Sequence, residues 1–198
     1  MFRALLLAPP GAGKGTQGER LAARHGVPHL ATGDLLRDHV ARGTDLGRAA
    51  KEHMDAGRLV PDQLVIDMVL RRIGNDGKPL QDFLLDGFPR TLTQARFAYE
   101  WGKQNHRTFH AVIMLEVPED ELVRRLVQRG RDSGRSDDTE DVIRNRLHVY
   151  EENTAPLVGF YEARGILLRV DGTGTVEEVT ERIEAGLVPL LEGSATRG

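Results

Sequence analysis

Short apolar runs recur along this chain and are separated by stretches of helical periodicity. The runs at residues 2–7, 83–85, 109–117 and 165–170, with a shorter one at 28–31, have the length of buried strands. Apolar positions recur at helical spacing over residues 14–25, 61–73, 93–104, 118–128 and 176–191. The alternation of strands and helices predicts an α/β fold, a five-stranded parallel sheet with helices on both faces.

Three segments interrupt this alternation. Residues 32–57 contain two helical patterns that are broken at residues 42–44. Residues 130–136 are predicted to form a short loop. The long helix that follows should bend at Pro156, because proline cannot continue the helical hydrogen bonds. No internal repeat or long linker divides the 198 residues, which predicts a single domain.

The first apolar run leads into a glycine-rich loop that opens a helix. Residues 11–16 read Gly-Ala-Gly-Lys-Gly-Thr, and Lys14 is the only lysine among the first fifty residues. Glycines let the backbone approach a ligand and turn N–H groups toward it, and the helix N-terminus adds more N–H groups. The order of strand, glycines, lysine, hydroxyl and helix predicts a phosphate-binding loop of the kind found in P-loop NTPases.

One position departs from the usual spacing of such a loop, G-x-x-x-x-G-K-[ST]. Ala8 stands where the first glycine is expected, and Gly15 separates Lys14 from Thr16. Alanine is strained in the left-handed conformation that glycine adopts readily, so we expect a negative φ at Ala8. Because Pro9 and Pro10 carry no N–H group, the donors to phosphate should come from residues 11–16.

The distribution of basic residues also favours phosphate. Four of the 27 basic residues are lysines, which leaves 23 arginines, and seven of these lie between Arg124 and Arg146. The planar arginine side chain suits bidentate contacts with phosphate. Acidic neighbours in this stretch also fit a solvated helix, but the phosphate-binding loop favours ligand contact. The net charge of −3 gives no support for nucleic-acid binding.

A phosphate-binding loop needs a magnesium partner, and the chain offers two oxygen ligands. Asp86 follows the apolar run 83–85, at the end of a buried strand, and Thr16 supplies a hydroxyl beside Lys14. The sequence lacks the signatures of protein kinases. An acceptor that is itself a phosphate is mostly ionised near neutral pH and needs no strong base. Catalysis then requires alignment and charge neutralisation.

Composition excludes several other classes. No apolar run approaches the ~20 residues of a membrane-spanning helix, and the N-terminal run is too short for a signal peptide. The absence of cysteine excludes disulfides and cysteine-based zinc sites. We therefore expect a cytoplasmic protein with no membrane partner.

Several segments together resemble the adenylate kinases. They are residues 11–17 (GAGKGTQ), 32–37 (TGDLLR), 86–90 (DGFPR) and 134–138 (GRSDD), with further matches at 154–157 and 170–173. The similarity covers essentially the whole chain, and this set in this order is far more specific than the loop alone. It implies reversible, magnesium-dependent phosphoryl transfer from ATP to AMP, giving two ADP.

The resemblance also implies roles for individual residues. ATP would be bound by Gly11, Ala12, Gly13, Lys14, Gly15, Thr16, Arg125, Arg129 and Gly174. AMP would be bound by Thr32, Arg37, Arg58, Leu59, Val60, Gly87, Phe88, Pro89, Arg90, Gln94, Arg135 and Arg146. The catalytic side chains would be Lys14, Arg90, Arg125, Arg129, Arg135 and Arg146, with Thr16 and Asp86 at the magnesium ion, in part through water.

The same resemblance predicts how the domain is divided. The core would comprise residues 1–31, 62–129 and 137–198, with a small helical AMP-binding insertion at 32–61 and a short lid at 130–136. Longer relatives carry a lid insertion, often with zinc-binding cysteines, where this chain has only residues 130–134 between Arg129 and Arg135. It therefore resembles the short-lid form, without zinc. The expected partners are ATP, AMP and ADP, and the expected state is a monomer.

Two alternatives remain open at this point. UMP/CMP kinases share the short lid, but in them the position of Thr32 is alanine and an asparagine-rich segment replaces Gln94. A nucleotide-dependent switch without turnover would share the phosphate-binding loop, but it has no need of an acceptor site containing Arg37, Arg90 and Gln94. Turnover assays with different nucleoside monophosphates separate these three functions.

Overall fold

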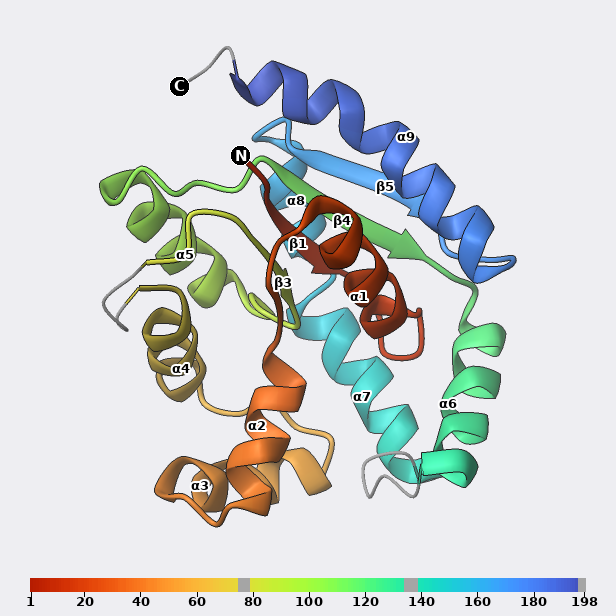
Figure 1. Ribbon diagram of the computed structural model, residues 1–198. Helices are drawn as coiled ribbons and strands as arrows, with labels where there is room; N and C mark the ends of the chain where they lie inside the picture. The colour runs from red at the N-terminus through yellow and green to blue at the C-terminus, as the bar shows by residue number, and fades with distance from the viewer. Residues whose placement is uncertain (75–78, 134–138, 196–198) are drawn as a thin grey trace.

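A parallel sheet of five strands forms the centre of the molecule (Figure 1). The computed structural model describes residues 1–74, 79–133 and 139–195. The strands are β1 (Arg3–Leu7), β2 (His29–Ala31), β3 (Phe83–Asp86), β4 (Ala111–Glu116) and β5 (Leu167–Asp171), in the spatial order β2-β3-β1-β4-β5. All four pairings are parallel, and the register places Leu5 beside Leu85 and Val112. The predicted five-stranded α/β fold is confirmed.

Helices connect the strands and cover both faces of the sheet (Figure 1). They are α1 (Lys14–His25), α2 (Thr32–Ala41), α3 (Asp45–Asp55), α4 (Asp62–Gly74), α5 (Leu92–Gln104), α6 (Glu119–Ser133), α7 (Glu140–Asn153), α8 (Leu157–Glu162) and α9 (Val176–Ala195). None of the helices in the described part of the chain is both long and apolar enough to cross a membrane.

Alternating side chains of the strands supply two hydrophobic cores, one on each face of the sheet. Leu5 and Leu85 pack with residues of α4, α5 and α8 on one face. Leu6 and Leu84 pack with residues of α1 and α9 on the other. β1 is buried along its whole length, as expected for a central parallel strand. The loop that follows β1 is thereby anchored at the carboxyl edge of a rigid sheet.

The helices α2 and α3 form a hairpin that projects from the carboxyl edge of the sheet (Figure 1). They are separated at residues 42–44, as predicted. Thr44 caps α3 because its hydroxyl accepts a hydrogen bond from the Gly47 N–H at 3.1 Å. Gly43 adopts a left-handed φ of 61°, which reverses the chain. The hairpin therefore forms from local turn and capping signals.

Several predicted boundaries were wrong. Residues 130–133 of the predicted loop instead belong to α6, which continues to Ser133, and residues 134–136 lie outside the described residues; Gln128 donates to Asp132 one helical turn ahead at 2.9 Å, which supports the longer helix. The strand expected at 165–170 starts at Leu167, since Gly165 has a left-handed φ of 64°. The helix expected to bend at Pro156 instead ends at Asn153, and Pro156 is the N-cap of a separate helix, α8.

Candidate functional site

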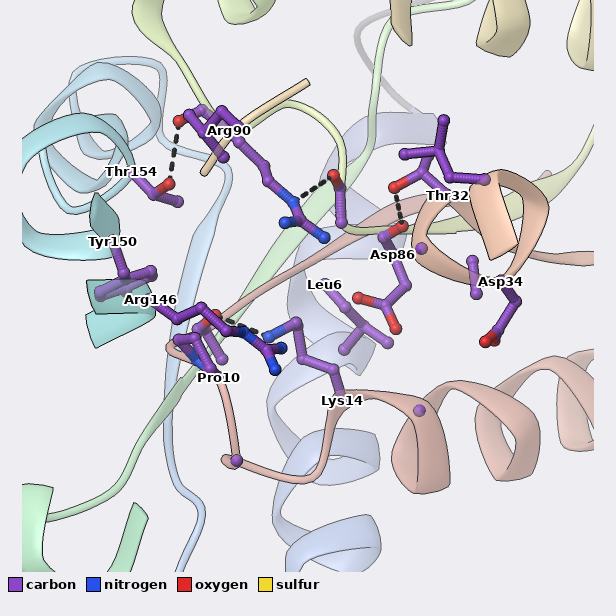
Figure 2. A pocket seen from close by; sticks show the side chains of 18 of the residues that line it. Leu6, Pro10, Lys14, Thr32, Asp34, Asp86, Arg90, Arg146, Tyr150 and Thr154 are labelled. Atoms are coloured by element: carbon purple, nitrogen blue, oxygen red, sulfur yellow. Dashed lines mark hydrogen bonds between the residues drawn. The ribbon is translucent and has the colours of Figure 1, made fainter. Parts of the chain in front are cut away.

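A cavity of about 480 Å³ opens at the carboxyl ends of β1 and β3. In open parallel sheets this edge is the usual place for ligands. The walls of the cavity come from the loop after β1, from α2, from the segment between α3 and α4, and from α6 and α7. Figure 2 shows Lys14, Asp86, Arg90 and Arg146 extending into this space from different elements.

Glycines give the loop after β1 its shape. Gly11 and Gly13 have left-handed φ values of 86° and 94°, whereas Ala8 is not among the residues with positive φ. The prediction of a negative φ at Ala8 is confirmed, and the alanine is accommodated without the strain of a left-handed backbone. A Cβ on Gly11 would also lie 2.9 Å from the Leu122 carbonyl oxygen and from Leu126. This glycine is therefore required for both conformation and packing.

Lys14 folds back over the loop that it follows. Its Nζ donates to the carbonyl oxygens of Ala8 at 2.7 Å and Pro9 at 3.1 Å. Burial lowers the pKa of Lys14 to about 8; Asp86 opposes this shift, and Arg90 is the first of three arginines that reinforce it. Positive charge thus gathers in one cavity, which favours an anionic ligand.

Asp86 ends β3 and is only 8% exposed. Its carbonyl oxygen accepts a hydrogen bond from Thr32 Oγ1 at 3.1 Å, and its carboxylate lies 3.9 Å from His29 Nε2. Thr16, in the first turn of α1, lines the same cavity. No group of three His, Asp or Glu side chains suited to a metal occurs among the described residues. A hard cation here would need further oxygen ligands from a bound phosphate or water, as Mg²⁺ commonly has.

The backbone of Arg90 is held by two side chains, and its own side chain is held by the backbone. Its N–H donates to Gln94 Oε1 at 2.8 Å, and its carbonyl oxygen accepts from Thr154 Oγ1 at 2.9 Å. Its Nε donates to the Gly87 carbonyl oxygen at 2.8 Å (Figure 2). Three hydrogen bonds thus restrain the position from which the guanidinium group enters the cavity.

Gln94 is 2% exposed and lines the cavity. Its side chain is held by a residue that was not predicted to have a site role. Its Nε2 donates to Asp62 Oδ1 at 2.7 Å. Asp62 is the first residue of α4 and lies 32 positions earlier in the chain. In the sequence Asp62 carries only the signal of a helix start, because acidic residues are common in a first turn. Its contact with Gln94 depends on the packing of two helices.

Helices α6 and α7 supply the other arginines of the cavity. Arg125 donates from Nε to Glu121 at 2.7 Å and reaches the Gly172 carbonyl oxygen at 3.3 Å. Arg146 lies against the segment after α3, since a Cβ on Gly57 would lie 2.9 Å from its Cγ. This close packing joins α7 to the segment that carries Arg58.

Most of the sequence-predicted site residues come together at this cavity. Those that line it are Gly11, Gly13, Lys14, Gly15, Thr16, Thr32, Arg37, Arg58, Leu59, Val60, Asp86, Gly87, Pro89, Arg90, Gln94, Arg125, Arg129 and Arg146. Ala12 and Phe88 are buried beneath the surface, and Gly174, in the turn before α9, does not line the cavity. Arg135 lies outside the described residues.

Among the polar and ionisable side chains that line the cavity, four were not predicted to have a site role: Glu19, Asp34, Tyr150 and Thr154. Thr154 belongs to a segment that carried the family resemblance, and this resemblance could have identified it as a site residue. Tyr150 is buried, which raises its pKa, and its hydroxyl contacts Met114 Sδ at 3.7 Å. No sequence pattern distinguishes Tyr150 from an ordinary core residue of an amphipathic helix.

Comparison with known proteins agrees with the sequence resemblance. The sequence model of the adenylate kinase family matches residues 6–166. The chain is 50% identical to an adenylate kinase of Thermus thermophilus over 183 residues, covering 92% of this chain and 95% of that protein. It is 49% identical over 187 residues to an adenylate kinase of Kocuria rhizophila, covering 94% and 99%. A Synechococcus adenylate kinase is 50% identical over 194 residues, covering 98% and 97%.

Proposed function

This chain belongs to the adenylate kinase family and is an ATP:AMP phosphotransferase, and we propose that the cavity at the carboxyl edge of its sheet is where the two nucleotides react. One observation carries this proposal. The glycine-rich loop with Lys14 and a second polar cluster containing Arg90 and Gln94 face the same space of about 480 Å³. A donor phosphate and an acceptor phosphate bound to these two clusters would meet inside one cavity.

The proposed ATP site is the loop together with α6. Residues 11–16 would surround the phosphates with backbone N–H groups, and Lys14 would exchange its carbonyl contacts for phosphate oxygens. Arg125 and Arg129 project from α6 into the same cavity and would lie along the ATP. Gly174 does not line the cavity, so we propose only that the turn it forms lies near the adenine of ATP.

The proposed AMP site lies between the α2–α3 hairpin and the segment after β3. Arg37, Arg58 and Arg90 would bind the phosphate, and Thr32 and Gln94 the base. Arg37 contacts Asp34 at 2.5 Å, so a phosphate would have to compete with that carboxylate. In this proposal residues 32–61 are the AMP-binding insertion and residues 130–136 the lid, and closure of both would exclude water from the transferring phosphoryl group.

Adenylate kinases generally use Mg²⁺, and the oxygen groups of Thr16 and Asp86 fit this ion. When bound, Mg²⁺ neutralises negative charge on the phosphates. Asp86 suits this position because it is held by the end of β3, and its backbone is fixed by Thr32. The arginines of α6 and α7, with Lys14 and Arg90, would align the two phosphates and offset the negative charge that Mg²⁺ does not neutralise. The scheme needs no group from a second chain, and we propose that the protein acts as a monomer.

The test is to follow a mixture of ATP, AMP and Mg²⁺ by ³¹P NMR. The proposal predicts conversion to ADP, approach to the same equilibrium from ADP alone, and loss of turnover when Mg²⁺ is removed with EDTA. ADP formation that requires ATP but is unaffected by Arg90→Ala would contradict the assignment of the cavity, since Arg90 would then have no part in phosphate alignment.

A further inference from the structure

A network of hydrogen bonds joins the first turns of α4 and α5 next to the cavity, and Asp62 is at its centre. Asp62 Oδ1 accepts from Gln94 Nε2 at 2.7 Å, and Asp62 Oδ2 accepts from Thr91 Oγ1 at 3.0 Å. Thr91 caps α5 and accepts in turn from the Gln94 N–H at 3.1 Å. Both carboxylate oxygens of Asp62 therefore contact the turn that presents Gln94.

The two partners of the Gln94 side chain leave its amide a single orientation. The Arg90 backbone N–H can only donate, so at 2.8 Å it requires an oxygen. The Asp62 carboxylate accepts, so at 2.7 Å it requires the NH₂ group. Reversing the amide would place its oxygen against the carboxylate and its NH₂ against the Arg90 N–H. Such mismatches are costly at a residue that is 2% exposed.

We propose that Asp62 is a positioning residue that sets the purine specificity of the acceptor site by holding Gln94 in this orientation. The inference rests on the proposed AMP site. One N–H of Nε2 and one lone pair of Oε1 remain after the contacts with Asp62 and Arg90. The side chain thus presents a donor and an acceptor whose order along its edge is fixed.

This order matches adenine and not the 6-oxopurines. Adenine offers an acceptor at N1 and a donor at its 6-amino group, which pair with the remaining N–H and lone pair of Gln94. Hypoxanthine and guanine carry a hydrogen on N1 and an oxygen at C6, so their order is reversed. They would require the reversed amide, which Asp62 and Arg90 oppose. A site that leaves polar groups mispaired discriminates strongly between similar substrates.

The variant Asp62→Asn tests this role with little change in shape. Asparagine can accept from the present Gln94 amide, but after its own rotation it can also donate to a reversed one. One of the two restraints is therefore lost, while the Arg90 N–H remains. We expect the ratio of kcat/KM for AMP to that for IMP to fall by at least ~10-fold, which is the scale of one hydrogen bond in a buried site. The change should arise mainly in KM, with kcat for AMP within about threefold of wild type, since the reacting phosphate is not touched.

Asp67→Asn is the matched control. Asp67 lies on the same helix, is exposed, and contacts Gln63 Nε2 at 2.7 Å away from the cavity. It should leave the AMP-to-IMP ratio unchanged. If Asp62→Asn fails to fold by circular dichroism, Asp62→Ser replaces it, because a hydroxyl both donates and accepts and serine is tolerated at a helix start.

The outcomes separate this inference from the proposed function. A wild-type enzyme that does not phosphorylate AMP would remove both, whereas one that uses AMP and IMP equally well would overturn the role of Asp62 alone. A wild-type preference for AMP that Asp62→Asn and Asp62→Ser leave within twofold, or a parallel loss with both substrates, would overturn the role of Asp62 alone. A narrowed ratio in the folded variant, with the Asp67 control unchanged, supports it.

Discussion

At the scale of single residues, Lys14 is a partly buried cation at the centre of the proposed site, with Asp86 and several arginines around it. Within the loop its Nζ is held by two carbonyl oxygens. The same ammonium group is available to phosphate oxygens once a nucleotide displaces these contacts. Lys14 is therefore expected to act mainly on the transition state, where charge develops on the transferring group.

Replacing Lys14 with methionine should lower kcat by at least ~10²-fold, the usual scale for one preorganised electrostatic contact. Methionine keeps much of the side-chain volume, so circular dichroism should show an intact fold. Lys103→Met, at an exposed position of α5, serves as the control and should retain normal kcat. A folded Lys14→Met enzyme with near-normal turnover would show that the loop lysine has no catalytic role.

The lowered pKa of Lys14 predicts how ATP binding changes with pH. Because its pKa in the free protein is about 8, the ammonium group loses its proton as the pH rises through this value, although bound phosphate favours the protonated form. The Kd for ATP should therefore increase above about pH 8, by up to ~10-fold per pH unit. Calorimetric titrations between about pH 7 and about pH 9.5 measure this, and Lys14→Met should give a flatter profile. An equally steep rise in Lys14→Met would assign the effect to another group.

The residues of the site differ in how far the sequence alone could predict them. Lys14 and Asp86 were predicted because the neighbouring residues indicate their roles. Lys14 follows a glycine-rich loop, and Asp86 follows an apolar run. Asp62 was missed because its role depends on Gln94, which lies 32 residues away. Arg135 remains a prediction, because it lies outside the described residues. Site residues with a local sequence motif can thus be predicted from the sequence, whereas contacts between elements can be identified only once the fold is known.

At the scale of elements, the segment after α3 packs closely against α7. Asn145 Nδ2 donates to the Ala56 carbonyl oxygen at 2.7 Å, and Gly57, with a left-handed φ of 67°, leaves room for the Arg146 side chain. The approach is close enough that any Cβ on Gly57 would displace Arg146. The position of this arginine in the cavity therefore depends on a glycine of another element.

Two glycine-to-alanine variants separate backbone strain from this contact. Gly57→Ala and Gly43→Ala both place alanine at a left-handed φ, of 67° and 61°, and the backbone strain alone should lower the free energy of unfolding by about 1 kcal/mol in each. A Cβ on Gly43 meets no atom within 4 Å, whereas one on Gly57 meets Arg146 and Val142 of α7. We expect only Gly57→Ala to reduce kcat as well, by about tenfold. Equal kcat values in the two variants would show that the position of Arg146 does not depend on Gly57.

Arg146→Lys tests the guanidinium group itself. Lysine keeps the positive charge but loses the planar pair of donors, so the loss should lie mainly in kcat, with the fold intact by circular dichroism. Normal kcat in this variant would mean that α7 contributes structure and not chemistry to the cavity.

Elements were predicted more reliably than their boundaries. The helix at 14–25 was predicted with its observed limits, because loop glycines precede it and Gly26 follows it with a left-handed φ of 63°. The end of α6 was misplaced by five residues, since Gly130 suggested a loop that helical contacts override. Boundaries with strong local signals are predictable, and those decided by side-chain contacts along the helix are less so.

At the scale of the whole molecule, the amino edge of the sheet is closed by a polar cluster of its own. Arg3 is 5% exposed and donates to the Thr108 carbonyl oxygen at 2.9 Å, and its Nη2 lies 2.9 Å from His110 Nε2. Burial and the adjacent Arg3 lower the pKa of His110 to about 4. The native state thus holds His110 neutral at a pH where an unfolded chain protonates it.

This cluster predicts a loss of stability in mild acid. The pKa of His110 is lower in the folded state than its ordinary value near 6.5, so the unfolded state binds more protons between pH 6.5 and 4. Stability should be complete above pH 6.5 and fall as the pH drops through this window, by at most about 1.4 kcal/mol per pH unit from this group. Urea denaturation at several pH values should show a smaller pH dependence for His110→Gln than for wild type. Identical pH profiles would exclude His110 as the cause.

The central claim is that one cavity of this molecule joins ATP to AMP and recognises adenine through Gln94. The most direct test is a coupled assay of ADP formation that compares kcat/KM for AMP, UMP, CMP and GMP in wild type, in Gln94→Ala, and in Gln104→Ala as an exposed control on the same helix. We predict a strong preference for AMP that Gln94→Ala weakens by at least ~10-fold and Gln104→Ala leaves unchanged. Equal kcat/KM for AMP and CMP in the wild-type enzyme would contradict the account.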